Sequence, residues 1–142
     1  MKKRIIMIVS VLFLTACATA PPKYGAFVAF DSDKDAEVMA QDAIGQISSV
    51  YPPAKTSIQV VHNAEDKIGQ ALLSGLRTKG YKLYEASQPE SDIPIPMFYV
   101  LDKIDLSMWR LTIAVGTKEF SRPYLAQNGA PVVAAGCWTY KE

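Results

Sequence analysis

The chain has 142 residues, of which 49% are hydrophobic and 20% are charged, and its formal net charge is +1. A chain of this length forms one domain and buries about two thirds of its unfolded surface. Three of its fifteen basic residues stand at positions 2–4, so the remainder carries twelve basic and fourteen acidic residues. Because nucleic-acid binding needs concentrated Lys and Arg, this balance argues against a nucleic-acid partner.

The N-terminus has the pattern of a bacterial lipoprotein signal peptide. A basic triplet at 2–4 precedes an apolar run from Ile5 to Leu14, which is much shorter than the ~20 residues that span a bilayer. Thr15 and Ala16 then lead directly to Cys17. We predict cleavage between Ala16 and Cys17, with a diacylglycerol and an N-acyl chain on Cys17 and no other cofactor. An ordinary cleaved signal and an uncleaved anchor helix are the alternatives.

These boundaries divide the chain into three parts. The signal peptide spans residues 1–16, a membrane tether spans 17–24, and a single periplasmic domain spans 25–142. The tether contains two consecutive prolines and no periodic pattern. Ala18 follows the lipidated cysteine at the position where lipoproteins kept in the inner membrane carry Asp. We therefore expect a lipid-anchored protein of the outer membrane that faces the periplasm.

The first half of the domain is predicted to alternate between strands and helices. A strand is expected over 25–30, and Ser32 with Asp35 has the spacing of a capping box that starts a helix. Apolar residues then recur at helical spacing until Tyr51-Pro52-Pro53 ends the helix. This apolar stripe consists of Ala36, Met39, Ala40, Ala43, Ile44 and Ile47.

A second strand–helix–strand unit follows. Residues 56–61 alternate and are rich in β-branched side chains, which indicates a strand. Asn63 is the expected cap of the next helix, with Glu65 and Asp66 in its first turn, and Lys79-Gly80 is its expected end. A strand over 81–86 and a polar loop over 87–96 complete this half. The buried face of the second helix is expected to comprise Ile68, Ala71, Leu72, Gly75 and Leu76.

The second half of the domain contains strands and no helix. Strands are expected at 97–104, 108–115, 118–126 and 131–140, with tight turns at Gly116-Thr117 and Asn128-Gly129. Pro123 inside the third of these strands indicates an edge or a bulge. The domain is therefore predicted to be α+β, with two helices packed on a small β-α-β-α-β sheet followed by an antiparallel β-meander.

Two chemically reactive side chains each stand alone in the sequence. His62 is the only histidine, and we interpret it as a loop or capping residue because no organised set of catalytic partners is near it in sequence. Cys137 remains unpaired once Cys17 carries lipid. Its neighbours indicate a packed strand, so we expect a buried thiol, with an intermolecular disulfide as the alternative. One histidine and one distant cysteine do not predict a zinc site.

The charged residues of the second half also indicate no catalytic site. Asp102 and Asp105 lie near a turn between strands and are expected to be solvated. Arg110 and Arg122 are expected to form a cross-strand charge ladder with Glu119 on the solvent-facing side of the sheet. We therefore predict a protein that is not an enzyme, with no metal site and no small-molecule substrate.

Aromatic residues gather in the second half. Core packing accounts for several of them, and a meander with so many rings also has the composition of a contact surface. We take Tyr99, Trp109, Tyr124 and Trp138 as candidate interface residues. The complete group is Tyr99, Trp109, Phe120, Tyr124, Trp138 and Tyr140.

Several segments of the chain resemble the TrbH family of conjugal transfer lipoproteins. The resemblance covers most of the mature chain and is clearest after residue 97. Family members tend to carry Ala where this chain has Cys137, which implies that the thiol has no role. The matching segments are Tyr99-Val-Leu-Asp102, Trp109 to Gly116, Ser121 to Gln127 and Ala135-Gly-Cys-Trp138, together with the lipobox and residues 76–84.

The resemblance implies a structural or assembly protein of the mating-pair-formation apparatus, a type IV secretion system that moves DNA between cells. The implied partners are the membrane and other envelope subunits of that system. Only Cys17, as the lipid attachment point, carries over from the family. The alternative is an outer-membrane assembly or ligand-binding lipoprotein with a pocket between the helices and the sheet.

Overall fold

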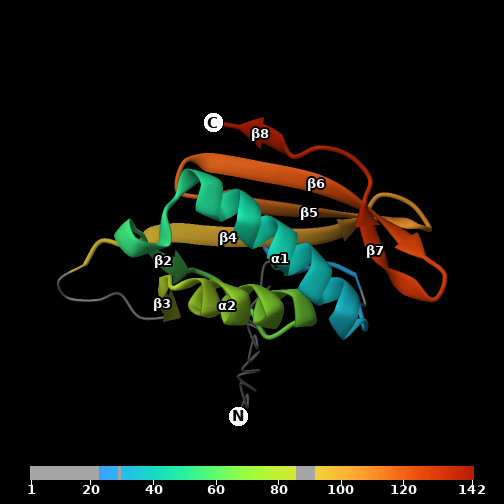
Figure 1. The fold of residues 1–142 in the computed structure, drawn as a ribbon, viewed down its shortest axis with the longest axis horizontal. Coiled ribbons are helices and arrows are strands. Elements are labelled where there is room, and N and C mark those ends of the chain that lie inside the picture. Colours follow the sequence, from blue (N-terminus) through green and yellow to red (C-terminus); the bar gives the residue numbers. More distant parts are fainter. Residues whose placement is uncertain (1–22, 29, 86–91) are drawn as a thin grey trace, which may run out of the picture.

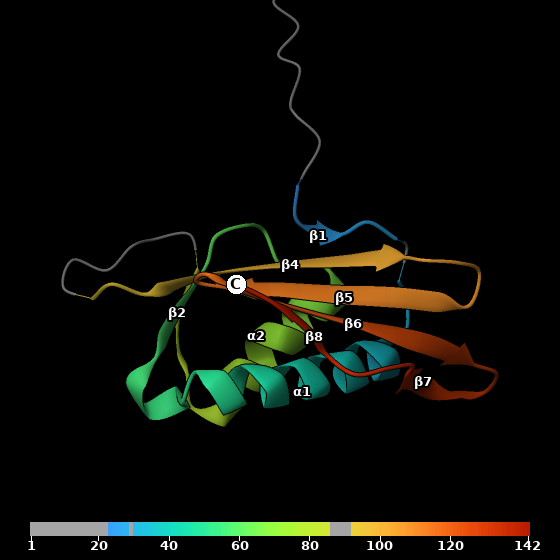
Figure 2. The ribbon, with the colours of Figure 1, turned by 90° about the horizontal axis from the view of Figure 1, so that it is seen from above.

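The domain has two layers, in which two helices lie on one face of an eight-stranded mixed sheet (Figure 1, Figure 2). The computed structural model describes residues 23–28, 30–85 and 92–142, so the predicted signal peptide and most of the tether lie outside the described residues. This architecture confirms the predicted α+β class. The elements are β1 (Gly25–Ala26), α1 (Asp33–Val50), the 3₁₀ helix η1 (Pro53–Lys55), β2 (Ser57–Val60), α2 (Lys67–Lys79), β3 (Lys82–Glu85), β4 (Ile95–Lys103), β5 (Met108–Val115), β6 (Lys118–Gln127), β7 (Ala130–Ala134) and β8 (Thr139–Lys141).

The sheet is parallel on one side of β4 and antiparallel on the other. Its strand order is β3-β2-β4-β5-β6-β7, with β1 beside β4 and β8 beside β6. β2 runs parallel to both β3 and β4, because the α2 crossover returns the chain to the end of the sheet where β2 began. β5, β6 and β7 follow β4 as the predicted antiparallel meander.

One edge of β4 is shared by two short parallel strands. β2 pairs with Ile95–Met97 at the start of β4, and β1 pairs with Val100 and Leu101 further along it. The Phe27 backbone N–H then donates to the Leu101 carbonyl at 2.9 Å. The strand expected over 25–30 is therefore short, but it makes the N-terminal segment part of the sheet.

Asp92, shortly before β4, lies on the face of the sheet opposite the helices, which we call the outer face. Asp92 accepts hydrogen bonds there from Ser57 (2.9 Å), Lys82 (3.1 Å) and Tyr84 (3.2 Å). These side chains alternate along β2 and β3 with residues that pack into the core.

α1 begins and ends where the sequence predicted. The Ser32 hydroxyl accepts from the Asp35 backbone N–H at 3.2 Å, and Tyr51 is the C-cap. All six residues of the predicted stripe are buried. The Asp35 carboxylate, which the capping box assigned to Ser32, accepts from the Val132 backbone N–H at 2.8 Å and so fastens β7 to the helix.

α2 begins later than the sequence predicted. Asp66 is its N-cap, because Asp66 Oδ1 accepts from the Gly69 backbone N–H at 2.9 Å. The assignment of the cap to Asn63 is wrong, since Asn63 Oδ1 accepts from the Glu65 N–H at 3.1 Å in a turn before the helix. Gly80 ends α2 as expected, in the left-handed conformation with φ of +97°.

The buried face of α2 is also shifted from the prediction. Ile68, Leu72 and Leu76 are buried as expected, and Leu73 joins them. Ala71 and Gly75 are only half-buried because they lie where α2 faces α1. Leu73 lies next to the predicted stripe, on the side towards the end of β2.

The two helices run parallel and share one core with the inner face of the sheet. Lys67 at the start of α2 bonds to Asp33 at the start of α1, and the Tyr81 hydroxyl after α2 donates to the Tyr51 carbonyl after α1. The core continues through the alternating residues of the central strands, including Met97, Tyr99, Leu101, Leu111, Ile113, Val115 and Tyr124.

β6 is flanked along its far edge by β7 and then by β8. Pro123 lies between these two pairings, where its missing N–H interrupts no ladder, and its carbonyl accepts from the Ala135 N–H at 2.9 Å. The register irregularity falls further along β6, between Leu125 and Gln127. The single closing strand predicted over 131–140 is therefore two strands separated by residues 135–138.

Gly69 is required where α2 meets β4. A Cβ at this position lies 2.6 Å from the Ala64 carbonyl oxygen and even closer to the Tyr99 hydroxyl. We expect Gly69→Ala to lower the free energy of unfolding by about 1–3 kcal/mol, measured as a lower urea midpoint of the chain without its signal peptide. Gly45→Ala on α1 is the matched control, because a Cβ there meets no atom within 4 Å. It should raise stability by about 0.5–1 kcal/mol, and equal effects of the two substitutions would contradict this packing.

Candidate interaction surfaces

Tyr99 is a core residue that fixes α2 to the sheet. Its side chain is 1% exposed, and its hydroxyl donates to Asp66 Oδ2 at 2.6 Å. Asp66 Oδ1 caps α2 at the same time, so one carboxylate holds both the helix N-terminus and β4. This burial contradicts the hypothesis that Tyr99 is an interface residue.

Tyr124 plays the same part for α1. It is also 1% exposed, and its hydroxyl donates to Asp42 Oδ2 at 2.6 Å. Arg122 Nη1 donates to both oxygens of Asp42, at 2.9 and 2.8 Å, so the carboxylate is fully engaged. The interface hypothesis for Tyr124 is therefore also wrong, and both tyrosines belong to the joint between helices and sheet.

The two tryptophans are half-buried and lie at the margins of the core. Trp109 meets Phe30 edge to face, with ring centroids 5.7 Å apart. Trp138 lies beside Arg122, whose guanidinium carbon is 5.8 Å from the ring centroid. Both rings pack against the core and keep part of their surface in contact with solvent. Their role in an interface stays a prediction.

Cys137 is exposed, which contradicts the expectation of a buried thiol. It lies in the segment between β7 and β8, where the strand pattern stops. Arg122 Nε donates to the Gly136 carbonyl at 2.8 Å, so this carbonyl bonds to a side chain of β6 and not to the backbone of a neighbouring strand.

His62 completes the edge of β4 between β2 and β1. Its Nδ1 lies 2.8 Å from the Asn63 carbonyl oxygen, and because a carbonyl only accepts, Nδ1 carries the proton. Nε2 then accepts from the Tyr99 backbone N–H at 3.2 Å. The imidazole therefore takes the place of a strand residue, which fits the predicted structural role.

The N-terminal segment packs over this histidine on the outer face. The Tyr24 ring lies 4.3 Å from the Phe98 ring and 5.7 Å from the His62 ring, measured between centroids. Tyr24 was assigned to the tether, but these contacts make it the first residue of the domain that packs on the sheet. The chain therefore enters the fold on the side away from the helices (Figure 2).

The predicted charge ladder is wrong, because its two arginines lie on opposite faces of the sheet. Leu111 opposes Arg122 on the helix side, whereas Arg110 opposes Pro123 on the outer face. Arg110 Nε donates to Asp102 Oδ1 at 3.0 Å, and a second bond joins the same two side chains.

Asp105, the other acidic residue that was expected to be solvated, forms hydrogen bonds within its own turn. Asp105 Oδ1 accepts from the Ser107 backbone N–H at 2.8 Å and from the Ser107 hydroxyl at 3.2 Å. The backbone hydrogen bond is the main reason that the pKa of Asp105 lies below its ordinary value. Asp102 and Asp105 therefore have separate partners.

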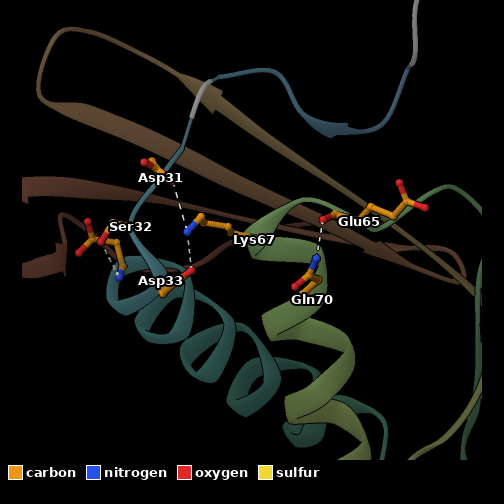
Figure 3. Close-up of polar contacts among 7 residues, drawn as sticks. Asp31, Ser32, Asp33, Glu65, Lys67 and Gln70 are labelled. Carbon is orange, nitrogen blue, oxygen red and sulfur yellow. Dashed lines mark hydrogen bonds and ion pairs between the residues drawn. The ribbon is translucent and has the colours of Figure 1, made fainter.

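The N-terminal ends of the two helices are joined by Lys67. Its Nζ lies 2.7 Å from Asp33 and 3.3 Å from Asp31, between α1 and α2 (Figure 3). Behind this bridge, a polar groove of about 370 Å³ lies between the solvent-facing sides of the helices. We call it the helix groove; it is lined by Asp33, Ala36, Glu37, Gln41, Lys67, Gln70, Ala71, Ser74, Gly75 and Thr78.

A larger hollow of about 580 Å³ opens at the carboxyl end of β2. It is lined by residues 60–65 with Leu73 and Glu85, and no residue of β4, β5 or β6 lines it. It is therefore at one end of the sheet and not over its centre, where the alternative function would need a pocket. Among the described residues, no group of His, Cys, Asp and Glu side chains has the arrangement of a metal site.

The structure also reveals an apolar row that sequence reasoning missed. On the outer face, Met108 opposes Leu125, which opposes Val133, and the Ile104 N–H donates to the Met108 carbonyl across the hairpin. Leu106 at the hairpin tip is 92% exposed. Within each strand, these side chains follow the ordinary alternation between the two faces. Only the register between the strands shows that they align with one another. The apolar row consists of Ile104, Leu106, Met108, Leu125 and Val133.

Comparison with known proteins identifies one family. The family model described as "Conjugal transfer protein TrbH" matches residues 21–142. No curated protein and no solved structure matches the chain. None of the helices in the described part of the chain is long and apolar enough to cross a membrane.

Tyr99 and Tyr124 make the fold sensitive to alkaline pH. Burial, and then the hydrogen bond to an aspartate, raises the pKa of each hydroxyl above the ordinary tyrosine value of about 10. Both hydroxyls stay neutral in the folded chain at pH values where the same hydroxyls ionise in the unfolded chain. Their contribution to the free energy of unfolding is therefore complete below about pH 10 and declines as the pH rises further.

We expect the urea midpoint to fall between about pH 9 and pH 11. The double variant Tyr99→Phe with Tyr124→Phe should be less stable at neutral pH, because Asp66 loses its partner, but it should lose less stability over the same pH interval. An unchanged slope in the variant would show that other groups govern the alkaline transition.

Proposed function

Because the chain belongs to the TrbH family of conjugal transfer proteins, we propose that it is an outer-membrane lipoprotein of a type IV secretion apparatus. In this proposal it acts by holding and contacting other envelope subunits and catalyses no reaction. The observation that carries the proposal is the position of the lipobox, whose Cys17 lies four residues before the start of the family match at residue 21.

Lipid attachment gives the domain its location. Two or more acyl chains on Cys17 make anchoring durable, whereas one chain does not. Residues 17–23 span at most about 25 Å when fully extended, so the domain stays close to the membrane surface. Confinement at that surface raises its effective concentration near other membrane-bound subunits, and weak contacts then suffice for assembly.

The helix groove is the surface that best fits contact with other subunits. The two helices that line it lie on the side of the sheet away from β1 (Figure 2), so in this proposal it faces away from the anchor. Asp33 and Glu37 line one wall, and Lys67 lies at its end. Charged groups of both signs around a shallow groove favour orientation and specificity of a partner more than raw affinity.

The alternative, a lipoprotein that binds a ligand between helices and sheet, lacks a supporting observation. The residues there are close-packed, with Met39, Ile58, Leu72, Met97 and Leu111 all 0% exposed. β3 ends the sheet and pairs only with β2 among the described residues, so the domain has a closed core with an open strand edge. That combination supports the assembly role.

Loss of the lipid anchor should release the protein and impair transfer. The test variant carries Cys17→Ser behind an ordinary cleavable secretion signal, so that no lipid is attached. We expect it in the soluble periplasmic fraction, with a conjugation frequency reduced by at least about tenfold, because the effective concentration at the membrane is lost. Cys137→Ser is the matched control and should keep both membrane fractionation and transfer. Mass spectrometry of the native protein that finds no acyl chain on Cys17 would refute the anchor.

Contacts through the helix groove can be tested by site-specific photo-crosslinking in conjugating cells. A photoreactive residue at Glu37 on α1 should give adducts with other secretion subunits. The same residue at Glu119 is the matched control, because it is an equally exposed glutamate on the outer face of β6. Adducts from position 119 alone, or from neither position, would contradict contact through the groove.

A further inference from the structure

The apolar row stands out because three of its side chains are well exposed, whereas Phe98 further along the same face is covered by Tyr24. Ile104 is 49% exposed, Val133 40% and Leu106 92%, whereas Met108 and Leu125 are half-buried beside them. Together these side chains form a strip from the β4–β5 hairpin across β5, β6 and β7. Phe27, which is 49% exposed, lies beside the end of β4.

The neighbouring charges on this face are already engaged. Asp102 and Arg110, the next residues along β4 and β5, form a doubly hydrogen-bonded pair. The Thr112 and Ser121 hydroxyls, one row further, bond to each other at 2.9 Å. At the tip, the Asp105 carboxylate is turned back onto Ser107, which leaves Leu106 as the outermost side chain. Little polar desolvation therefore opposes burial of the row.

The shape of the row fits a lipid surface better than a protein. A stable protein interface buries about 800 Å² on each partner, which requires a broad complementary patch. This row is a narrow strip that ends in a projecting turn. Single apolar side chains on such a projection gain free energy by entering the acyl boundary of a bilayer, where no matching surface is needed.

The path of the N-terminal segment places the membrane on the same side. Tyr24 packs on Phe98 on the outer face, so the domain begins on that side of the sheet. Phe98 and Ile104 are six residues apart along β4, which is about 20 Å. Residues 17–23 span at most about 25 Å. One bilayer surface is therefore within reach of both the acylated cysteine and the hairpin tip.

We infer that the apolar row is a second membrane contact, in which Leu106 and Ile104 enter the interface of the bilayer that holds the lipid anchor. This inference rests on the proposed function for the presence of the anchor, but the row itself is a property of the fold. It gives the domain a fixed orientation, with the outer face towards the lipid and the helix groove towards the periplasm.

The first experiment measures the row without the anchor. The mature chain with Cys17→Ser is sedimented with vesicles of phosphatidylethanolamine and phosphatidylglycerol. Leu106→Ser should lower the partition coefficient about tenfold, because most of a leucine side chain leaves the apolar phase. Val38→Ser on α1 is the matched control, since Val38 is an exposed apolar residue on the helix side, and it should have no effect. Equal binding of the Leu106→Ser variant and its parent would overturn the inference.

The second experiment uses the acylated chain in the same vesicles. In a Cys137→Ser background, a nitroxide on Leu106→Cys should collide more with oxygen than with a water-soluble nickel complex, and a nitroxide on Val38→Cys should show the reverse. A label at 106 that is open to the nickel complex, or shielded from both, would refute lipid contact. Mass spectrometry that finds no acyl group on Cys17 would refute the proposed function and leave the first experiment as the test of the row.

Discussion

Two buried tyrosine–aspartate hydrogen bonds determine how the helices sit on the sheet. Tyr99 of β4 donates to Asp66 of α2, and Tyr124 of β6 donates to Asp42 of α1. A buried hydroxyl or carboxylate without its partner costs about 1–3 kcal/mol or more, so each pair favours one position of its helix over all others. The absence of a side chain at Gly69 follows from the same constraint, because the Tyr99 hydroxyl fills that space.

This joint also explains why Tyr99 and Tyr124 are not part of a contact surface. Tyr99 and Tyr124 serve the helix–sheet joint, and Trp109 and Trp138 close its margins. Arg122 belongs to the same arrangement, since it binds Asp42 and then holds the segment around Gly136. The two surfaces that we propose for contact are built from other residues, namely the charged helix groove on one side and the apolar row on the other.

Features set by local periodicity were predictable from the sequence, and features set by register were not. The α1 stripe, the Gly80 cap and the β5–β6 turn each depend on residues close together in the chain. Asn63 and Asp66 are both good caps, and the choice between them depends on Tyr99, which lies more than thirty residues away. The exposure of Cys137 likewise depends on the hydrogen bond from Arg122 to Gly136. The family was predicted from strand patterns, and these patterns identify no functional residue.

The edge of β4 links the anchor to the orientation of the whole domain. β2, the His62 ring and β1 occupy that edge in succession, so the N-terminal segment is joined to the sheet by backbone hydrogen bonds before it turns into α1. A lipid anchor on a loose tether would leave the domain free to tumble at the membrane surface. Here Tyr24 and β1 hold the start of the domain on the outer face, and under the proposed lipidation of Cys17 a short tether would restrict which face meets the bilayer. The proposed protein contact and the proposed lipid contact would then lie on opposite faces of the sheet, so that one small domain could make both at the same time.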